Sequence, residues 1–175
     1  MKSTSWYAER YVSKFGWHLV PIEPRRKFPT ADDWGNNLLS EPESARAFYD
    51  DRTDWNVGLA LGPSGMCSLD IDCEESLAVI MAEFGIPMSE LDGYPTIKGS
   101  DKGRRLLFRV PDGMTLPYCK LNWPTQGDAS KRYTVFELRA ACDGKQRQDV
   151  LPPSWHPTAN RPYAWQVQPA ASRNE

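Results

Sequence analysis

The sequence predicts an α+β fold. Segments with helical spacing of apolar residues and short strand-like segments both occur, and the strands do not alternate strictly with helices. Fifteen prolines in 175 residues interrupt many elements, which argues against a helical bundle. The length predicts one domain, over residues 1–168. We expect the polar tail, 169–175, to be disordered and to lead to further domains of a longer protein.

The first third of the chain contains two predicted helices separated by a strand and a loop. Apolar residues recur at helical spacing before Gly16, a residue that commonly ends a helix. Ser40 and Glu43 form a capping box, with Pro42 in the first turn of the helix that follows. In order, we expect a helix over 7–15, a strand over 17–22, a long loop over 23–37 and a short helix from 40–43 to about 49.

The rest of the chain is predicted to be mostly strands. Two apolar strands flank a glycine-containing turn at 62–65 and are expected to pair as a hairpin. A helix follows, with Leu77, Ile80, Met81 and Phe84 on one face and Gly85 at its end. The predicted strands are 56–61, 66–72, 104–110, 133–139, 148–151 and 163–167, and 111–130 is expected to be irregular.

Composition excludes several classes of protein. The formal net charge of −2 argues against a protein that coats nucleic acid through bulk electrostatics. We find no apolar run of about 18 residues and no secretory signal, so no membrane partner is expected. Four cysteines in a chain of this length do not make a disulfide scaffold. A reduced, cytoplasmic protein is therefore expected.

The most informative triplet is Asp70-Ile71-Asp72, at the end of an apolar strand. Residues two apart on a strand face the same side, so Asp70 and Asp72 project together. Paired carboxylates repel each other, and a hard cation such as Mg²⁺ or Mn²⁺ removes that cost. The plainer interpretation is a solvated strand end, with Asp72 capping the next helix.

A third carboxylate, Glu137, lies on another predicted strand. Glu137 and Arg139 share the face opposite Phe136 and Leu138. If this strand neighbours that of Asp70, three carboxylates converge and can hold two metals about 3.5–4 Å apart, as in phosphoryl transfer. The simpler alternative is a surface ion pair between Glu137 and Arg139. Removing Asp70 and Asp72 is not expected to destabilise a solvated strand end.

A basic cluster lies between the two carboxylate strands. Arg105 and Arg109 share one strand face, and a glycine-containing loop over 98–103 precedes them. Such a loop can bring backbone N–H groups and lysines to a phosphate. An exposed hairpin turn with a solvated basic surface would show the same pattern.

Taken in order along the chain, these motifs resemble the bifunctional DNA primase/polymerase N-terminal domain, a branch of the archaeo-eukaryotic primase superfamily. The resemblance runs over roughly residues 8–166 and depends on the order and spacing of its motifs. It rests on Gly16-Trp17 with Pro21, Lys27-Phe28-Pro29 with Trp34, Asn56-Val57-Gly58, Gly62–Gly65, Asp70-Ile71-Asp72, Glu137 with Arg139, and Pro152-Pro153-Ser154-Trp155-His156 followed by Tyr163 and Trp165.

The resemblance implies a primase-like catalytic core, an α+β fold with mixed or antiparallel sheets flanked by helices. It implies a template-dependent nucleotidyltransferase of a phage or plasmid-type replication protein. The expected partners are single-stranded DNA template and primer, NTP or dNTP, and a helicase domain in the same or a partner chain. The catalytic and Mg²⁺- or Mn²⁺-binding residues would be Asp70, Asp72 and Glu137, and the nucleotide-binding residues Lys98, Ser100, Lys102, Arg104, Arg105, Arg139 and His156.

Two departures from the family pattern keep alternatives open. Arg105 occupies the position of a histidine that contacts nucleotide phosphates in the family, and Glu137 replaces the more usual Asp. Loss of the histidine is compatible with a catalytically degenerate nucleotide- or DNA-binding module. A different Asp-x-Asp enzyme, such as a Mn²⁺-dependent sugar-nucleotide transferase, would leave Glu137 and the Pro-Pro-Ser segment without a role.

We predict that Arg105 contacts the phosphates of a bound nucleotide. Arg105→Ala should weaken nucleotide binding by roughly 1.5–3 kcal/mol, the scale of a charge-assisted hydrogen bond. Arg105→His should restore part of that affinity, more at pH 6 than at pH 8, because a histidine loses its charge above about 6.5. Nucleotide dissociation constants of the three proteins measure this. Equal affinity for Arg105→Ala and wild type would identify a solvated residue.

Overall fold

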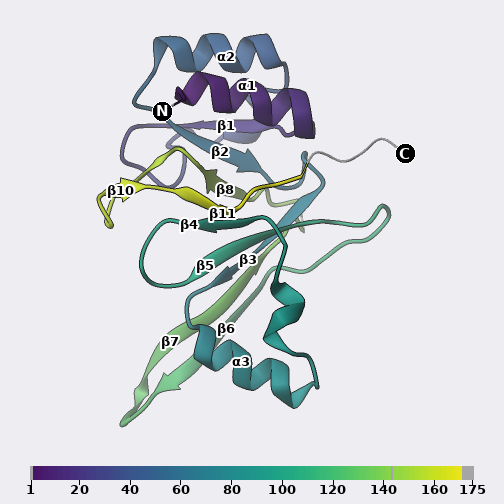
Figure 1. The fold of residues 1–175 in the computed structure, drawn as a ribbon, viewed down its shortest axis with the longest axis vertical. Helices are drawn as coiled ribbons and strands as arrows, with labels where there is room; N and C mark the ends of the chain where they lie inside the picture. The colour runs from purple at the N-terminus through teal and green to yellow at the C-terminus, as the bar shows by residue number, and fades with distance from the viewer. Residues whose placement is uncertain (1, 143, 171–175) are drawn as a thin grey trace.

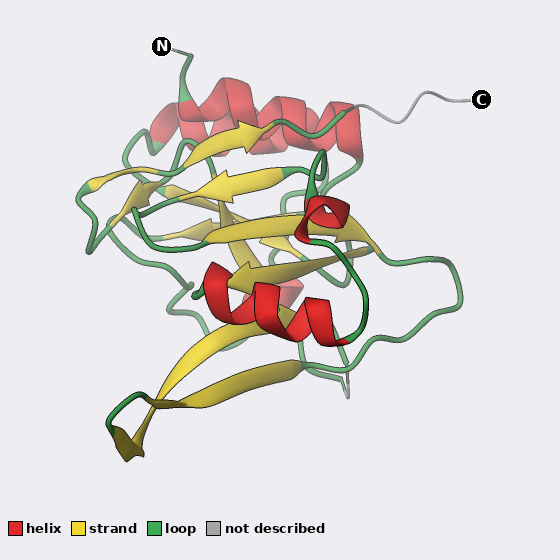
Figure 2. Ribbon diagram, turned by 60° about the horizontal axis from the view of Figure 1, so that its bottom comes forward, coloured by secondary structure: helices red, strands yellow, loops and turns green. Residues whose placement is uncertain are grey.

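A computed structural model describes residues 2–142 and 144–170 and confirms the α+β class (Figure 1). Its described helices are α1 (Thr4–Phe15), α2 (Pro42–Asp51) and α3 (Glu74–Glu83), with short 3₁₀ turns η1 (Trp34–Asn36) and η2 (Met88–Leu91). A three-stranded and a six-stranded antiparallel sheet share a core. Helices α1 and α2 lie beyond the three-stranded sheet, and α3 lies beside the six-stranded sheet (Figure 2). None of the described helices has the length and apolar character needed to cross a membrane.

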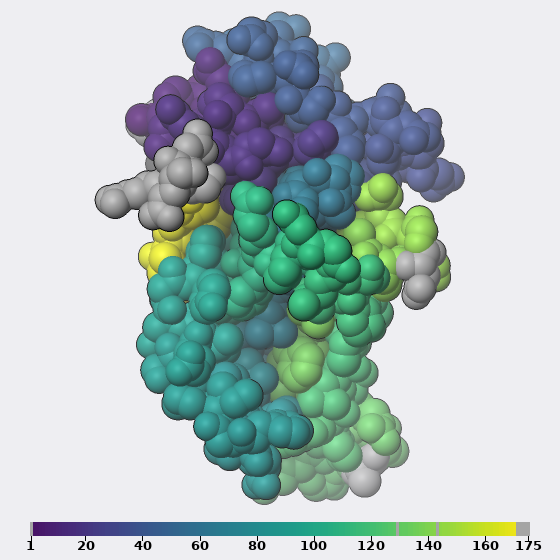
Figure 3. Space-filling model, turned by 90° about the vertical axis from the view of Figure 1, so that its right-hand side faces the viewer, coloured from purple at the N-terminus to yellow at the C-terminus, as the bar shows by residue number. Residues whose placement is uncertain are grey.

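The small sheet contains three strands and the large sheet six. The small sheet has the order β1 (Leu19–Ile22), β2 (Asn56–Ala60), β8 (Gln148–Leu151). The large sheet has the order β11 (Ala164–Val167), β4 (Thr96–Lys98), β5 (Arg104–Arg109), β3 (Met66–Ile71), β7 (Asp128–Arg139), β6 (Cys119–Thr125). A short ribbon pairs β9 (Trp155–His156) with β10 (Arg161–Pro162). Figure 3 shows the N-terminal third, in purple and blue, at the top of the molecule, and the middle of the chain, in teal and green, below it.

Local sequence explains the first helix and corrects the expectation for the second. The hydroxyl of Ser3 accepts a hydrogen bond from the Trp6 amide, and Gly16 ends α1 in the left-handed conformation, with φ 65°. The capping box expected at Ser40 does not form, because α2 begins at Pro42 after an extended Glu41 that makes no capping hydrogen bond. Proline is well suited to that first position, since it needs no partner for an amide hydrogen.

Three other sequence expectations are wrong. Strands β2 and β3 are not a hairpin, because β2 pairs with β1 and β8 on its two edges and β3 enters the other sheet. The segment 111–130 is not wholly irregular, since β6 and the start of β7 form a long hairpin there. Phe84 lies beyond the end of α3 and is 77% exposed. Of the tail expected to be disordered, residues 171–175 lie outside the described residues.

The two faces of the large sheet have different surroundings. One face packs Leu69, Ile71, Leu106 and Phe136 against Leu77 of α3. The opposite face carries Met66 and Leu107, which pack against the small sheet, and beyond them polar residues. Because side chains alternate along each strand, the polar residues at the end of β3 face the small sheet and not α3.

Candidate active site

Asp70 and Glu137 lie directly opposite each other on neighbouring strands. Asp70 pairs with Glu137 of β7 on one side and with Arg105 of β5 on the other. The two carboxylate strands are therefore neighbours, which is the condition set in the sequence analysis for their carboxylates to lie together. Asp72 lies in a bend just beyond the end of β3 and is exposed.

A buried carboxylate from the small sheet joins this row. Asp149 of β8 has a side chain with 0% exposure. It accepts hydrogen bonds from Arg139 Nη1 at 2.8 Å and from the hydroxyl of Ser68, and it forms an ion pair with Arg105 Nη1 at 3.2 Å. The two arginines and the serine belong to the large sheet. Asp149 therefore fastens one sheet to the other through charged hydrogen bonds.

The same two arginines hold the carboxylates of the large sheet. Arg105 Nη2 lies 2.7 Å from Asp70 Oδ2, and Arg139 Nη2 lies 3.2 Å from both Asp70 Oδ2 and Glu137 Oε2. The alternative of a surface ion pair between Glu137 and Arg139 is too simple, because Arg139 also binds Asp70 and the buried Asp149. Two arginines and three carboxylates form one network at the sheet interface.

Ionisation of the carboxylates follows from this network. Burial opposes ionisation of Asp70, but the charge and hydrogen bond of Arg105 outweigh it and lower the pKa of Asp70. Burial is likewise overcome at Glu137, whose pKa is lowered by Arg139. Asp72 behaves in the opposite way, since burial and then the charges of Asp70 and Glu137 raise its pKa. Repulsion among carboxylates is therefore concentrated on Asp72.

The expected convergence of three carboxylates on a metal cluster is not met by their side chains. Across residues 2–142 and 144–170, no three His, Cys, Asp or Glu side chains are gathered as a metal-binding group. The physical reason is that Arg105 and Arg139 draw the oxygens of Asp70 and Glu137 to themselves. The donor set still has the chemistry that Mg²⁺ and Mn²⁺ prefer, because all three ligands would be carboxylate oxygens.

A cleft of about 120 Å³ opens beside Asp70 and Asp72. It is smaller than the roughly 300–1,000 Å³ of an enclosed ligand pocket, so it can surround only part of a larger molecule. Its lining is basic and polar rather than apolar. The residues expected from the sequence that line it are Ser100, Lys102, Arg104, Arg105 and His156.

Two glycines let the loop after β4 approach the site closely. A side chain at Gly99 would collide with the rings of Tyr163 and His156. Gly103 has a φ of 66°, and a side chain there would collide with the backbone carbonyl of Ile71, next to Asp72. The loop therefore lies against the carboxylate strand because it lacks side chains at these two positions.

The remaining expected residues occupy different positions. Lys98 is exposed on β4 and does not line the cleft. Arg104 lies 3.3 Å from Glu74 at the start of α3. His156 is 7% exposed, its Nδ1 accepts a hydrogen bond from the Ala159 amide, and its ring lies 5.0 Å from that of Tyr163. Burial and then the charge of Lys27 lower the pKa of His156, which favours a neutral ring.

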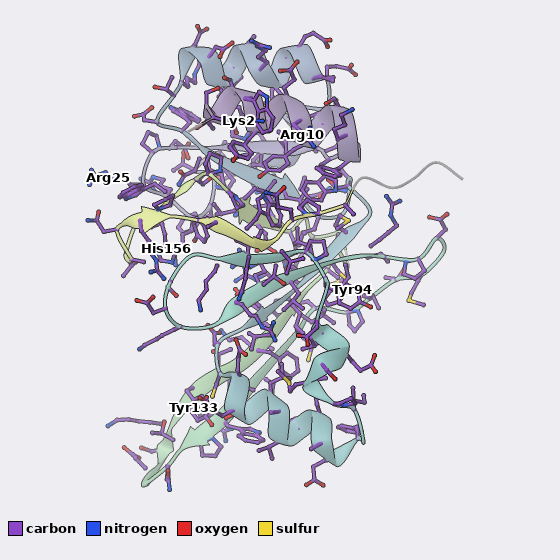
Figure 4. All side chains as sticks on the ribbon, viewed as in Figure 1. Lys2, Arg10, Arg25, Tyr94, Tyr133 and His156 are labelled. Carbon is purple, nitrogen blue, oxygen red and sulfur yellow. The ribbon has the colours of Figure 1, made fainter. Side chains whose placement is uncertain are left out.

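Sequence reasoning missed Lys27, Tyr163 and Asp149 as site residues. Lys27 and Tyr163 line the cleft, and burial together with Arg105 lowers the pKa of Lys27. The signal for Asp149 was its place in an apolar strand, 148–151, because a buried charge is costly unless it is paired. Figure 4 shows His156 beside the β4–β5 loop and Tyr133 on β7 near α3.

A comparison with models of protein families gives a match over most of the chain. The family model described as "Bifunctional DNA primase/polymerase, N-terminal" matches residues 8–174. No curated protein matches the chain.

We predict that Asp149→Asn destabilises the protein strongly. Removing one partner of a buried ion pair leaves uncompensated charge and typically costs about 3–5 kcal/mol of unfolding free energy. Urea denaturation measures the loss. Glu9→Gln is the matched control, because Glu9 pairs with the exposed Arg46 and such pairs contribute about 1 kcal/mol or less. Similar losses for the two variants would show that Asp149 does not fasten the sheets.

We also predict opposite effects for two aspartates that lie only two residues apart. Asp70→Asn should lower the unfolding free energy at pH 7 by about 1.5–3 kcal/mol, because it removes a charged hydrogen bond to Arg105. Asp72→Asn should leave stability unchanged or raise it, because it relieves repulsion. The expectation that losing both aspartates leaves stability unaffected is therefore replaced, since Asp70 is a partly buried ion-pair partner.

The pH dependence provides the check. A lowered folded-state pKa gives stability that is present above the unfolded value, about 4, and lost as the pH falls through the folded value. The difference between wild type and Asp70→Asn should thus be full at pH 7 and shrink below about pH 4. A difference independent of pH between 7 and 3 would contradict the ion-pair account.

Proposed function

Because this chain belongs to the bifunctional DNA primase/polymerase N-terminal family, we propose that it extends or initiates a DNA-templated strand by nucleotidyl transfer. The observation that carries the proposal is the pairing of Asp70 with Glu137 on one sheet face, with Asp72 just beyond the end of β3, beside a basic cleft. A sugar-nucleotide transferase would not be expected from the family match.

Nucleotidyl transfer forms a bond from a 3′-oxygen to the α-phosphorus of a nucleoside triphosphate and releases pyrophosphate. Catalysis of such a displacement consists mainly of positioning and of charge stabilisation on the phosphate oxygens. Lys27 and Lys102 lie in the cleft lining and are proposed to bind the triphosphate. Arg105 lines the same cleft, with its guanidinium group held by Asp70 and Asp149.

We propose that Asp70, Asp72 and Glu137 would hold the catalytic cations. Mg²⁺ or Mn²⁺ bound there would supply positive charge to the reacting phosphate oxygens and lower the pKa of the attacking hydroxyl. Arg105 and Arg139 occupy oxygens of Asp70 and Glu137, so they compete with a cation and reduce its affinity. In return, the arginines keep both carboxylates ionised at neutral pH.

A second function is favoured by that same competition. If the arginines hold the carboxylates too firmly, the chain is a catalytically degenerate module that binds nucleotide or DNA without turnover. In either case the proposed partners are single-stranded DNA template, primer and NTP or dNTP. A helicase domain, in this or another chain of a phage or plasmid-type replication protein, is proposed from the family resemblance alone.

We predict that Asp72→Asn reduces nucleotide incorporation more than about 100-fold. Loss of a metal ligand removes several kcal/mol of transition-state stabilisation, and each 1.4 kcal/mol is a factor of ten. Primer extension with Mg²⁺ and with Mn²⁺ measures the effect. Asp72 is the best variant for this test because its loss should not unfold the protein. The exposed Asp92 provides the control, and Asp92→Asn should extend primers as wild type does.

The same assay separates the two functions. Wild-type extension that Asp72→Asn abolishes supports the polymerase. Nucleotide binding without extension by the wild type, in either metal, supports the degenerate module. Extension by Asp72→Asn at the wild-type rate would refute the proposed carboxylate chemistry.

A further inference from the structure

The hairpin of β6 and β7 continues the large sheet beyond the candidate site and projects past α3 (Figure 1). Its two sides differ sharply. Leu121, Trp123, Tyr133 and Phe136 lie on the side that packs against α3. The other side is continuous with the face that carries Asp70 and Glu137, and we call it the site side.

Register fixes which residues the site side carries. Lys120 is opposite Glu137, Asn122 is opposite Thr134, and Pro124 is opposite Arg132. The register shifts between Leu121 and Asn122, which places one extra residue, Val135, in β7. The two strands then stay in phase as far as Pro124 and Arg132, where a second shift follows. The Thr134 hydroxyl donates to Asn122 Oδ1 at 3.1 Å, as expected for side chains on one side. The site side is therefore polar, with one cation at each end.

The two cations of the site side are exposed, and neither forms an ion pair within the part of the chain that the structure describes. The neighbouring Lys131 differs, because its Nζ lies 3.1 Å from Asp128 and its position in β7 places it on the opposite side of the hairpin. Lys120 lies near Asp72 and Glu137, whose ionisation its charge favours. Both Lys120 and Arg132 remain exposed to a ligand. Because Arg132 is opposite Pro124, four residues along β6, the cations are about 13 Å apart along the hairpin, the rise of roughly four stacked nucleotides.

The order of strands gives this surface a direction. The basic cleft lies over β4, β5 and the loop between them, on one side of β3. The hairpin lies on the other side of β3, because the order is β4-β5-β3-β7-β6. In an in-line displacement the attacking oxygen approaches opposite the leaving group. If the leaving pyrophosphate occupies the cleft, the attacking 3′-oxygen must approach from the side of β7 and β6.

We propose that the site side of the hairpin binds the sugar-phosphate backbone of the primer strand, whose 3′ end reaches Asp70 and Glu137. Lys120 contacts a phosphate close to that end, and Arg132 contacts one farther upstream. Asn122 and Thr134 lie between them and present polar groups rather than apolar surface. The direction of the strand rests on the proposed function, whereas the contact with a phosphate backbone rests on the hairpin itself.

The test is binding of a fluorescein-labelled DNA primer–template with a recessed 3′ end, followed by anisotropy over a range of salt concentrations. The variant is Lys120→Ala/Arg132→Ala. We expect binding about 10-fold or more weaker at 50 mM salt. The slope of the logarithm of the binding constant against the logarithm of salt concentration should become shallower by about 2, because each phosphate contact contributes about 0.9. In primer extension, the KM for primer–template should rise while the KM for nucleotide stays unchanged.

Two controls make the result specific. Lys131→Ala changes a cation on the other side of the same strand and should bind DNA as wild type does. The charge-preserving Lys120→Arg/Arg132→Lys should recover most of the affinity. Wild-type affinity in the double alanine variant, an equal loss in Lys131→Ala, or no binding by the wild-type protein at 50 mM salt would each overturn the proposal.

The experiments distinguish an error in the hairpin proposal from an error in the proposed polymerase function. If the double alanine variant extends and binds primer–template normally, the hairpin proposal is wrong and the polymerase function is untouched. If the wild type binds DNA through the hairpin, with the expected loss in the variant, but never incorporates nucleotide, the hairpin proposal is supported and the polymerase function is wrong.

Discussion

The site depends on one buried carboxylate, Asp149, held between two arginines. A charge with no exposure to solvent is tolerated only when attraction to opposite charges and hydrogen bonds offset the free-energy cost of removing it from water. Arg105 and Arg139 do so from the large sheet while Asp149 belongs to the small sheet, so the charge requirement also fixes how the sheets meet. Nη1 of each arginine contacts Asp149, and Nη2 of each contacts the large-sheet carboxylates, Asp70 for Arg105 and Glu137 for Arg139. Packing of the two sheets and orientation of the carboxylates are consequences of a single network.

This arrangement creates a tension between stability and chemistry. The arginines stabilise ionised carboxylates, which a metal site needs, yet they occupy the oxygens that a metal would use. Asp72 is outside the network, and its raised pKa reflects burial and its two carboxylate neighbours. A cation would relieve that repulsion and would therefore gain most from Asp72. Under the proposed function, the balance between the two arginines and a divalent cation would decide whether the fold acts as a polymerase or only binds its ligands.

The sequence predicts the parts of this site that depend on strand periodicity. The alternation of side chains along a strand predicts that Asp70 and Asp72 share one face, and that Glu137 and Arg139 do. The structure shows that the strands of Asp70 and Glu137 are neighbours. Parity carries no information on which sheet a strand joins, so the crossing from β2 to β3 was mistaken for a hairpin. The β6 strand was missed because its Pro124 is unfavourable in most strands and is tolerated here at the sheet edge. Asp149 was missed because Ser68 and Arg105, two of its three partners, are distant from it in sequence.

The small sheet contributes to the site through two consecutive residues of β8. Asp149 holds the two arginines, and the side chain of Gln148 donates to the backbone carbonyl of Lys27 at 2.8 Å. Lys27 lies in a long loop that has little regular structure to position it, so this contact fixes a cleft cation relative to the carboxylates. A strand of only four residues, Gln148–Leu151, thus sets the place of the cleft cation and of the arginines together. Any shift of the small sheet against the large one would move both sets at once, which makes the docking of the sheets part of the chemistry of the site.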